Sequence, residues 1–190
     1  ALLAHSGFTA NADVLEAHKG VIATFFPDRF DEARLLDYGK PWRVVDPGLA
    51  IKLFPSQFGT HFSINAALDI HRLAHGPARI ERVRIVSPLM KYVDRPQPAT
   101  GLDGKFSLQY VAAAAILDGK VNIDTFTDER RFRPDMVAML DRITLTQDAN
   151  IPGDFHKMHI AIEADLAGVA DFLRCEGHGV PPCECIQRLT

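Results

Sequence analysis

The sequence has few cysteines, no long apolar run and no large excess of either charge. Its three cysteines, Cys175, Cys183 and Cys185, all lie in the last sixteen residues, so disulfides cannot hold the main part of the chain. No window approaches the roughly eighteen apolar residues of a membrane-spanning helix. The first residues also lack the charged segment and cleavage pattern of a signal peptide. We therefore expect no membrane association and a cytoplasmic location.

The formal net charge is −3, and the basic residues are scattered along the chain. This distribution lacks the basic patch by which proteins bind nucleic acid or an acidic membrane surface. A small anion could still bind, because it needs only a local cluster of donors. The G-x-G-x-x-G, Walker, G-x-S-x-G and H-E-x-x-H motifs are also missing, which removes support for nucleotide-dependent, serine-hydrolase and zinc-protease functions.

With 190 residues and 47% apolar composition, the chain is large enough to bury a core. The first part reads as helical: the end of a helix closed by Gly7, a helix from Thr9 or Asn11 to about Phe26, and a short helix over residues 31–39. Residues 42–54 contain two strand-like runs, separated by a turn signal at residues 46–48.

The rest of the chain mixes strands and helices without regular alternation, which predicts an α+β fold and a small mixed sheet with flanking helices. We expect helices from Thr60 or Ser63 to Gly76, over 106–119 and over 135–143, and strands over 79–86, 143–147 and 158–166. The last residues have no usable periodicity, so we expect an irregular tail.

Lys52 interrupts the apolar run "LAIKLF". If this run is a strand, Lys52 shares one face with Ala50 and Phe54, which places it at a sheet edge or in a cleft. The side chain then either lies over Phe54 with its ammonium group in water or binds a carboxylate.

Gln57, Thr60 and His61 follow Lys52 at the expected start of a helix. Free backbone N–H groups and the helix dipole favour an anion at such a position. His61 and Lys52 could therefore face one ligand, although a histidine near a helix start is more often a hydrogen-bonded structural residue. Tyr92 precedes a proline-rich loop and either presents its hydroxyl to a cleft or covers the sheet.

Two groups of residues could bind a metal, but neither has a convincing ligand set. His71 and His75 are four residues apart on one expected helix, without an obvious third ligand. The tail holds four soft ligands with uncommon zinc spacing, namely Cys175, His178, Cys183 and Cys185. We predict no metal site and regard an unstructured tail as the better interpretation.

Several segments in order resemble the MmgE/PrpD family, which includes 2-methylcitrate dehydratase, cis-aconitate decarboxylase and iminodisuccinate epimerase. They are "HSGFTANADVLEAHKGVIATF", "PGLAIKLFPSQFGTHFSINAALDI", "KYVDRP" and "KFSLQYVAAAAILDGKVNIDTFTDE", and the resemblance covers about residues 1–166. It implies that residues 1–40 are the end of a helical domain, that 41–168 form an α+β lid domain, and that 169–190 are an irregular tail. The chain would then be the C-terminal portion of a family member.

The resemblance also implies a cofactor-independent lyase or isomerase that moves a proton next to a carboxylate of a small di- or tricarboxylate. Lys52 matches the family's active-site lysine, Tyr92 matches a tyrosine of the decarboxylases, and His61 matches a common histidine. These three are the expected catalytic residues, and Lys52, Gln57 and Thr60 are the expected substrate-binding residues.

Two features of this chain depart from the family pattern. Gln57 replaces a histidine of the decarboxylases, and Asn65 stands where many members have aspartate. The helical-domain segments that supply much of the family's catalytic set have no counterpart here, so enzymatic activity of this chain stays open. The alternative is a non-catalytic binding or assembly module that is incomplete without a helical partner. Full-length relatives are commonly dimers, which leaves a homodimer open.

Overall fold

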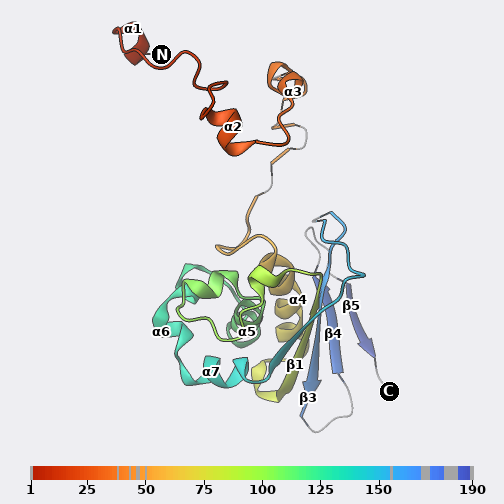
Figure 1. Ribbon diagram of the computed structural model, residues 1–190. Coiled ribbons are helices and arrows are strands. Elements are labelled where there is room, and N and C mark those ends of the chain that lie inside the picture. Colours follow the sequence, from red (N-terminus) through yellow and green to blue (C-terminus); the bar gives the residue numbers. More distant parts are fainter. Residues whose placement is uncertain are drawn as a thin grey trace. The chain divides into compact units, whose positions relative to one another are not determined.

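A computed structural model describes residues 2–37, 39–42, 44–45, 48–49, 51–154, 156–167, 172–177 and 184–188. The chain divides into two compact units, Ala1–Ile51 and Lys52–Thr190. We describe each unit separately (Figure 1).

The described residues of the first unit form three short helices, α1 (Leu2–His5), α2 (Val21–Phe25) and α3 (Glu32–Leu36). Asp31 caps α3 by accepting a hydrogen bond from the Ala33 N–H at 3.2 Å. The predicted helix from Thr9 or Asn11 to Phe26 is wrong over most of its length, because only α2 is helical and residues 12–20 form turns and bends. An isolated helix of that length is marginal in water when nothing packs on its apolar face. In this unit Val14 and Phe25 stay largely exposed.

The two strands predicted within residues 42–54 are also absent from the described residues of that segment, which has no regular secondary structure. The turn signal at Asp46–Pro47 lies outside the described residues. The segment is apolar enough for a strand, but a strand also needs a hydrogen-bonded neighbour. Lys52 therefore lies in an irregular segment and not on a sheet.

The second unit is built on a five-stranded mixed sheet with strand order β2-β1-β3-β4-β5. The strands are β1 (Ile80–Ser87), β2 (Ile143–Gln147), β3 (Ile160–Leu166), β4 (Phe172–Gly177) and β5 (Glu184–Arg188). β1 pairs parallel with β2 and antiparallel with β3, and the remaining pairs are antiparallel. The predicted α+β fold with a small mixed sheet is confirmed.

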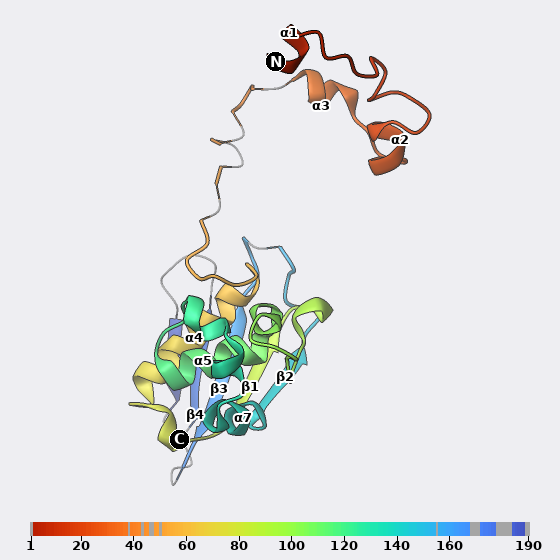
Figure 2. The ribbon, with the colours of Figure 1, turned by 90° about the vertical axis from the view of Figure 1, so that its left-hand side faces the viewer.

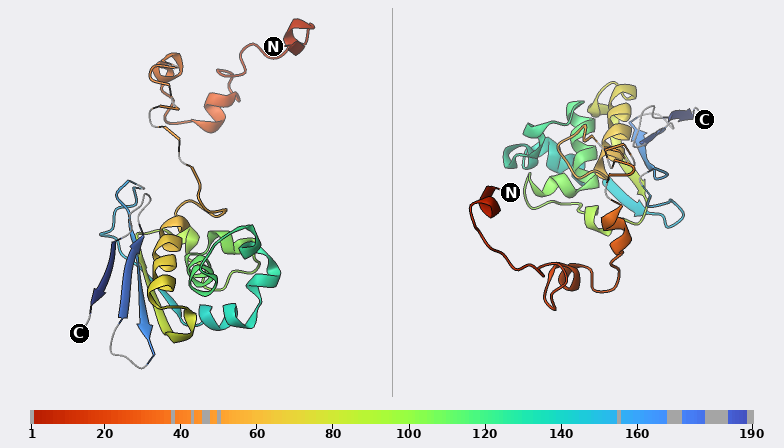
Figure 3. Two further views of the ribbon diagram at one scale, coloured as in Figure 1. Left: turned by 180° about the vertical axis from the view of Figure 1, so that it is seen from behind. Right: turned by 90° about the horizontal axis from the view of Figure 1, so that it is seen from above.

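The α-helices of the second unit lie on one face of this sheet (Figures 2 and 3). They are α4 (Thr60–Leu73), α5 (Leu108–Asp118), α6 (Asp128–Arg131) and α7 (Pro134–Leu140). In the part of this unit that the structure describes, four 3-10 turns connect the elements: η1 (Pro77–Arg79), η2 (Lys91–Val93), η3 (Asp103–Phe106) and η4 (Ile123–Phe126). α5 begins after Ser107, whose hydroxyl accepts from the Tyr110 N–H, and ends at the left-handed Gly119.

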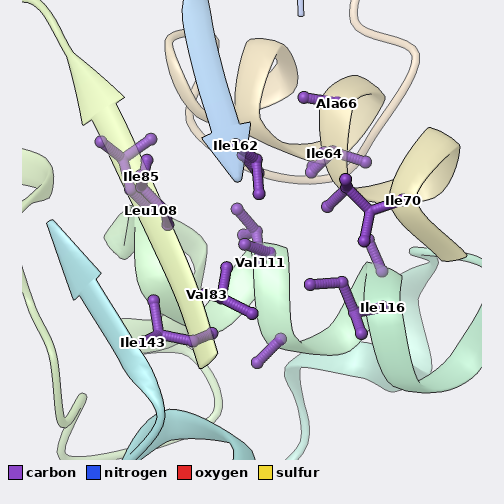
Figure 4. Packing of buried hydrophobic residues seen from close by; sticks show 14 of the residues in the cluster. Ile64, Ala66, Ile70, Val83, Ile85, Leu108, Val111, Ile116, Ile143 and Ile162 are labelled. Atoms are coloured by element: carbon purple, nitrogen blue, oxygen red, sulfur yellow. The ribbon is translucent and has the colours of Figure 1, made fainter. Parts of the chain in front are cut away.

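The core lies between the sheet and the helix pair α4 and α5 (Figure 4). Ile64 and Ile70 of α4 meet Val111 and Ile116 of α5, while the sheet contributes buried residues such as Val83, Ile85, Ile143 and Ile162. The two helices run parallel, because Ser63 contacts the Leu108 carbonyl near their starts and His71 contacts the Ile116 carbonyl near their ends. Thus the starts of α4 and α5 lie at the same end of the unit.

The opposite face of the sheet carries paired charges. Arg84 of β1 donates two hydrogen bonds to Asp165 and one to Glu163, both on β3. Arg174 of β4 pairs with Glu163 and with Glu176. This polar face explains why charged residues alternate with apolar ones along β1 and β3.

The segment after residue 168 corrects the prediction of an irregular tail, because it contains β4 and β5. β4 alternates strictly between buried and half-buried residues, with Leu173, Cys175 and Gly177 facing the core. Gly177 lies so close to α4 that an added Cβ would be 1.7 Å from the Phe62 carbonyl oxygen. Two of the three buried positions of β4 hold Cys175 and Gly177, which are not typical strand residues. The alternation of buried and half-buried residues was therefore not visible in the sequence.

Candidate active site

The residues predicted around Lys52 lie in a turn that leads into α4. The Lys52 ammonium group donates to the Ser56 carbonyl oxygen at 3.1 Å, so this exposed side chain folds back toward the helix start. Ser56 itself is buried, and its hydroxyl lies 2.9 Å from the Thr60 hydroxyl. One of the three ammonium protons is thereby used, and two remain for another acceptor.

Thr60 holds this turn together and is completely buried. Its hydroxyl lies 2.7 Å from the Gln57 carbonyl oxygen, and its backbone N–H donates to Gln57 Oε1 at 3.2 Å. The same N–H also donates to the Gln57 carbonyl oxygen at 3.0 Å, so both the backbone and the side chain of Gln57 satisfy this donor at the helix start. Thr60 therefore shapes the site through Gln57.

His61 lies inside the unit, only 5% exposed, between two aromatic rings. The Phe54 ring meets it edge-on and the Phe58 ring is tilted against it, each with a centroid separation of 5.3 Å. Burial is the largest effect on the His61 pKa and lowers it, and the Lys52 charge lowers it further, while hydrogen bonds with the backbone of Phe54 and Ser56 oppose this shift. The imidazole is therefore neutral at pH 7, and its buried Nε2 atom has no hydrogen-bond partner.

Tyr92 comes from η2 and is half exposed. Its hydroxyl oxygen lies 3.4 Å from Gln57 Nε2, which donates to it, and 3.8 Å from the Met90 sulfur. The structure thus brings Tyr92 to the same turn as Lys52 and Gln57, although Tyr92 follows them by more than thirty residues. A cation, an amide and a phenol are thereby linked through one short network.

Sequence reasoning missed two residues that hold the Tyr92 loop. The Gln109 amide, 2% exposed, donates to the Asp94 carboxylate at 2.7 Å and accepts from the Arg95 N–H at 3.3 Å. The Ser107 hydroxyl donates to the Arg95 carbonyl oxygen at 2.6 Å. A glutamine within the apolar run "LQYVAAAAI" was the available signal, because a buried amide needs partners.

Of the two groups of potential metal ligands, the described residues allow a statement about the pair His71 and His75 and not about the whole group in the tail. The His71 Nδ1 atom lies 2.6 Å from the Ile116 carbonyl oxygen, which gives this histidine a structural role. In the tail, His178 and Cys183 lie outside the described residues. Within the described ranges, no three histidine, cysteine or acidic residues gather as metal ligands.

We compared the chain with known protein families and with curated proteins. Residues 54–170 match the MmgE/PrpD C-terminal domain. Cis-aconitate decarboxylase from Mus musculus is 28% identical over 171 residues, and its counterpart from Homo sapiens is 26% identical over 178 residues. These matches cover 86% and 90% of this chain but only 35% and 37% of the relatives, so the chain spans little more than a third of their length.

Two further findings bear on the class of protein. No helix in the described part of the chain is long and apolar enough to cross a membrane. The family match begins two residues after Lys52 and includes Gln57, Thr60, His61 and Tyr92. Because the match covers more than half of the sequence, the chain belongs to the MmgE/PrpD family and carries its C-terminal domain.

Proposed function

We propose that this chain is the C-terminal part of a cofactor-independent lyase or isomerase that binds a small di- or tricarboxylate. The network that joins Lys52, Gln57 and Tyr92 carries the proposal. It links a cation and a phenol through the residues of one turn, and both groups suit a carboxylate ligand. Cis-aconitate is the carboxylate in the names of two relatives, and 2-methylcitrate is the substrate of another family branch.

In this proposal Lys52 pairs with a substrate carboxylate, and Tyr92 donates a hydrogen bond or a proton. A hydrogen-bonded contact between a lysine and a carboxylate stabilises a complex by about 1.5 to 3 kcal/mol. Proton removal next to a carboxylate builds enolate-like negative charge, which Lys52 would stabilise. His61 is buried, so it supports the turn as a neutral residue and does not reach the substrate directly.

The glutamine at position 57, where the decarboxylases have a histidine, affects which reaction this site could catalyse. An amide neither gains nor loses a proton near neutral pH, so Gln57 cannot replace a histidine as an acid or base. This favours dehydration or epimerisation over decarboxylation for the reaction of this protein.

The second candidate is a non-catalytic binding or assembly module. It is favoured by large apolar side chains that stay exposed in the first unit, among them Leu2, Phe8, Phe25 and Leu36. Exposed apolar surface of this kind is typical of a region that another polypeptide covers. A dimer of this chain is one form that such an assembly could take.

Titration of the purified chain with cis-aconitate and with 2-methylcitrate, followed by assays for water loss and for CO2 release, tests these proposals. Binding with turnover supports the enzyme. Binding without turnover supports a module that needs a partner. The absence of binding of either acid would overturn the proposed carboxylate site in this chain.

A further inference from the structure

The hydrogen bonds around Gln57 determine which way its side-chain amide faces. The Thr60 backbone N–H donates to the Gln57 carbonyl oxygen at 3.0 Å and also lies 3.2 Å from one end of the Gln57 side-chain amide. An oxygen at that end, Oε1, can share this N–H, whereas an NH2 group there would set two donors against each other, so the NH2 group faces Tyr92. The amide orientation follows from the fixed donor at the start of α4 and does not depend on Tyr92.

This orientation decides the role of the Tyr92 hydroxyl. Because Gln57 Nε2 donates to the phenol oxygen at 3.4 Å, the phenol proton is not needed for that contact. The phenol donates this proton to the Met90 sulfur at 3.8 Å, and a thioether is a weak acceptor. With Tyr92 half exposed, a carboxylate oxygen from solvent can take the proton in place of the sulfur.

Gly59 makes room for this arrangement. A Cβ atom at Gly59 would lie 3.0 Å from Gln57 Oε1 and 3.4 Å from the Met90 sulfur. A side chain there would press on the Gln57 amide, which would have to shift by a few tenths of an ångström, and would touch the Met90 sulfur. The backbone of Gly59 has ordinary helical angles, so its small size and not its conformational freedom matters here.

We propose that Gln57 is a positioning residue that holds Tyr92 as a hydrogen-bond donor to a carboxylate, and that Gly59 is required for this geometry. The ligand class rests on the proposed function, whereas the direction of the Gln57–Tyr92 hydrogen bond does not. Gln57 would act through Tyr92 and would not have to touch the ligand. The same network then explains why an amide suits position 57.

The direct test labels all tyrosines with 13C at Cζ, whose chemical shift responds to hydrogen bonds at the phenol oxygen. The Tyr92→Phe variant assigns the Tyr92 signal. Tyr110 is the internal control, because its buried hydroxyl donates to the Thr125 carbonyl oxygen at 2.6 Å, in a different part of the unit. An unchanged Tyr110 signal also shows that a variant is folded.

Gln57→Leu removes the donor to Tyr92, and Gln57→Glu replaces it with an acceptor that takes the phenol proton. We expect the Tyr92 signal to move in both variants, further in Gln57→Glu, and to move in Gly59→Ala as well. A Tyr92 signal that stays at its wild-type position in both Gln57 variants would overturn the proposal. This result does not require that the chain binds any carboxylate.

The second test measures the dissociation constant of cis-aconitate. We expect Gln57→Leu to weaken binding about three- to tenfold in the wild-type background and to have no further effect in Tyr92→Phe, because Gln57 acts through the phenol. An equal loss in both backgrounds would overturn the positioning role. If no variant and no wild-type protein binds, the proposed function fails, and the 13C signals alone decide the hydrogen-bond direction.

Discussion

The ammonium group of Lys52 donates a hydrogen bond to the carbonyl oxygen of Ser56 at 3.1 Å. This contact directs the lysine toward the turn that also carries Gln57. The Lys52 side chain is exposed, so the contact with Ser56 leaves both interpretations of the sequence, a solvated lysine and a carboxylate-binding one, to experiment. The contact joins the predicted cation to the polar residues at the start of α4, and it is the basis of the proposed carboxylate site.

The buried His61 predicts a pH dependence of stability. Because burial and the Lys52 charge lower the His61 pKa in the folded state, the unfolded chain binds a proton more readily. The contribution of His61 to the free energy of unfolding is therefore complete above the unfolded value of 6.5 and is lost as the pH falls from there through the lower folded pKa. Urea denaturation between pH 8 and pH 5 measures this loss.

The matched variant is His61→Gln, which removes the titrating group from its aromatic surroundings. We expect the difference in unfolding free energy between pH 8 and pH 5 to be smaller in this variant than in the wild-type chain. An identical pH dependence in the two proteins would contradict the neutral, buried state of His61.

Close packing at Gly101 predicts that a single methyl group destabilises the second unit. An added Cβ would lie 2.3 Å from the carbonyl carbon and oxygen of Thr127, and backbone atoms cannot move aside easily. Gly101→Ala should cost about 1 to 3 kcal/mol of unfolding free energy. The control is Gly153→Ala, because nothing lies within 4 Å of a Cβ there. Equal denaturation midpoints for both variants would contradict the packing.

The ion pair between Arg84 and Asp165 should contribute little, although its geometry is bidentate. The Arg84 guanidinium lowers the Asp165 pKa, so any stabilisation is present above the ordinary value of 3.8 and is lost as the pH falls further. Both side chains are about one third exposed, so water and salt screen the pair. We expect Asp165→Asn to cost less than about 1 kcal/mol at low salt.

The measurement is denaturation in about 0.05 M and about 1 M NaCl, where the Debye length shortens to about 3 Å. The cost of Asp165→Asn should shrink at high salt, while Glu81→Gln, on exposed Glu81 of β1, the strand of Arg84, should have little effect at either concentration. A large cost for Asp165→Asn that does not change with salt would show that Asp165 is more than a screened surface partner.

Local patterns predicted the parts of the fold that bury one clear apolar face. In β1, Val83 and Ile85 alternate with Arg82 and Arg84, and the structure confirms a strand with one polar face. The helix over 106–119 was predicted from its apolar spacing and from Gly119, which ends it in a left-handed conformation. In these elements local preference and tertiary packing agree.

Predictions failed where an element depends on a neighbour that the sequence does not reveal. The run around Lys52 has the composition of a strand, but no neighbouring strand pairs with it among the described residues. β4 was missed because Gly177 occupies a buried position against Phe62, where apolar character is not required. Such contacts are set by tertiary packing, so they leave little trace in local periodicity.

The candidate site was predicted as a set of residues but not as a geometry. Lys52, Gln57 and His61 are close in sequence, and their proximity was expected. The approach of Tyr92 to Gln57 depends on how the Tyr92 loop is anchored by Gln109 and Ser107. Gln109 stood out only as a polar residue in an apolar run, and nothing in the sequence linked it to Tyr92. The burial of His61 between Phe54 and Phe58 likewise follows from packing.

The most direct test of a carboxylate site at Lys52 is the dissociation constant of cis-aconitate for the wild-type chain, Lys52→Met and Lys120→Met. The proposed site lies at the start of α4, and Lys120 follows the end of the parallel helix α5. Lys120 is therefore a control lysine at the other end of the unit. We predict that Lys52→Met weakens binding at least about thirtyfold, which corresponds to about 2 kcal/mol, and that Lys120→Met leaves it unchanged. Equal dissociation constants for the wild-type chain and Lys52→Met would contradict the carboxylate site.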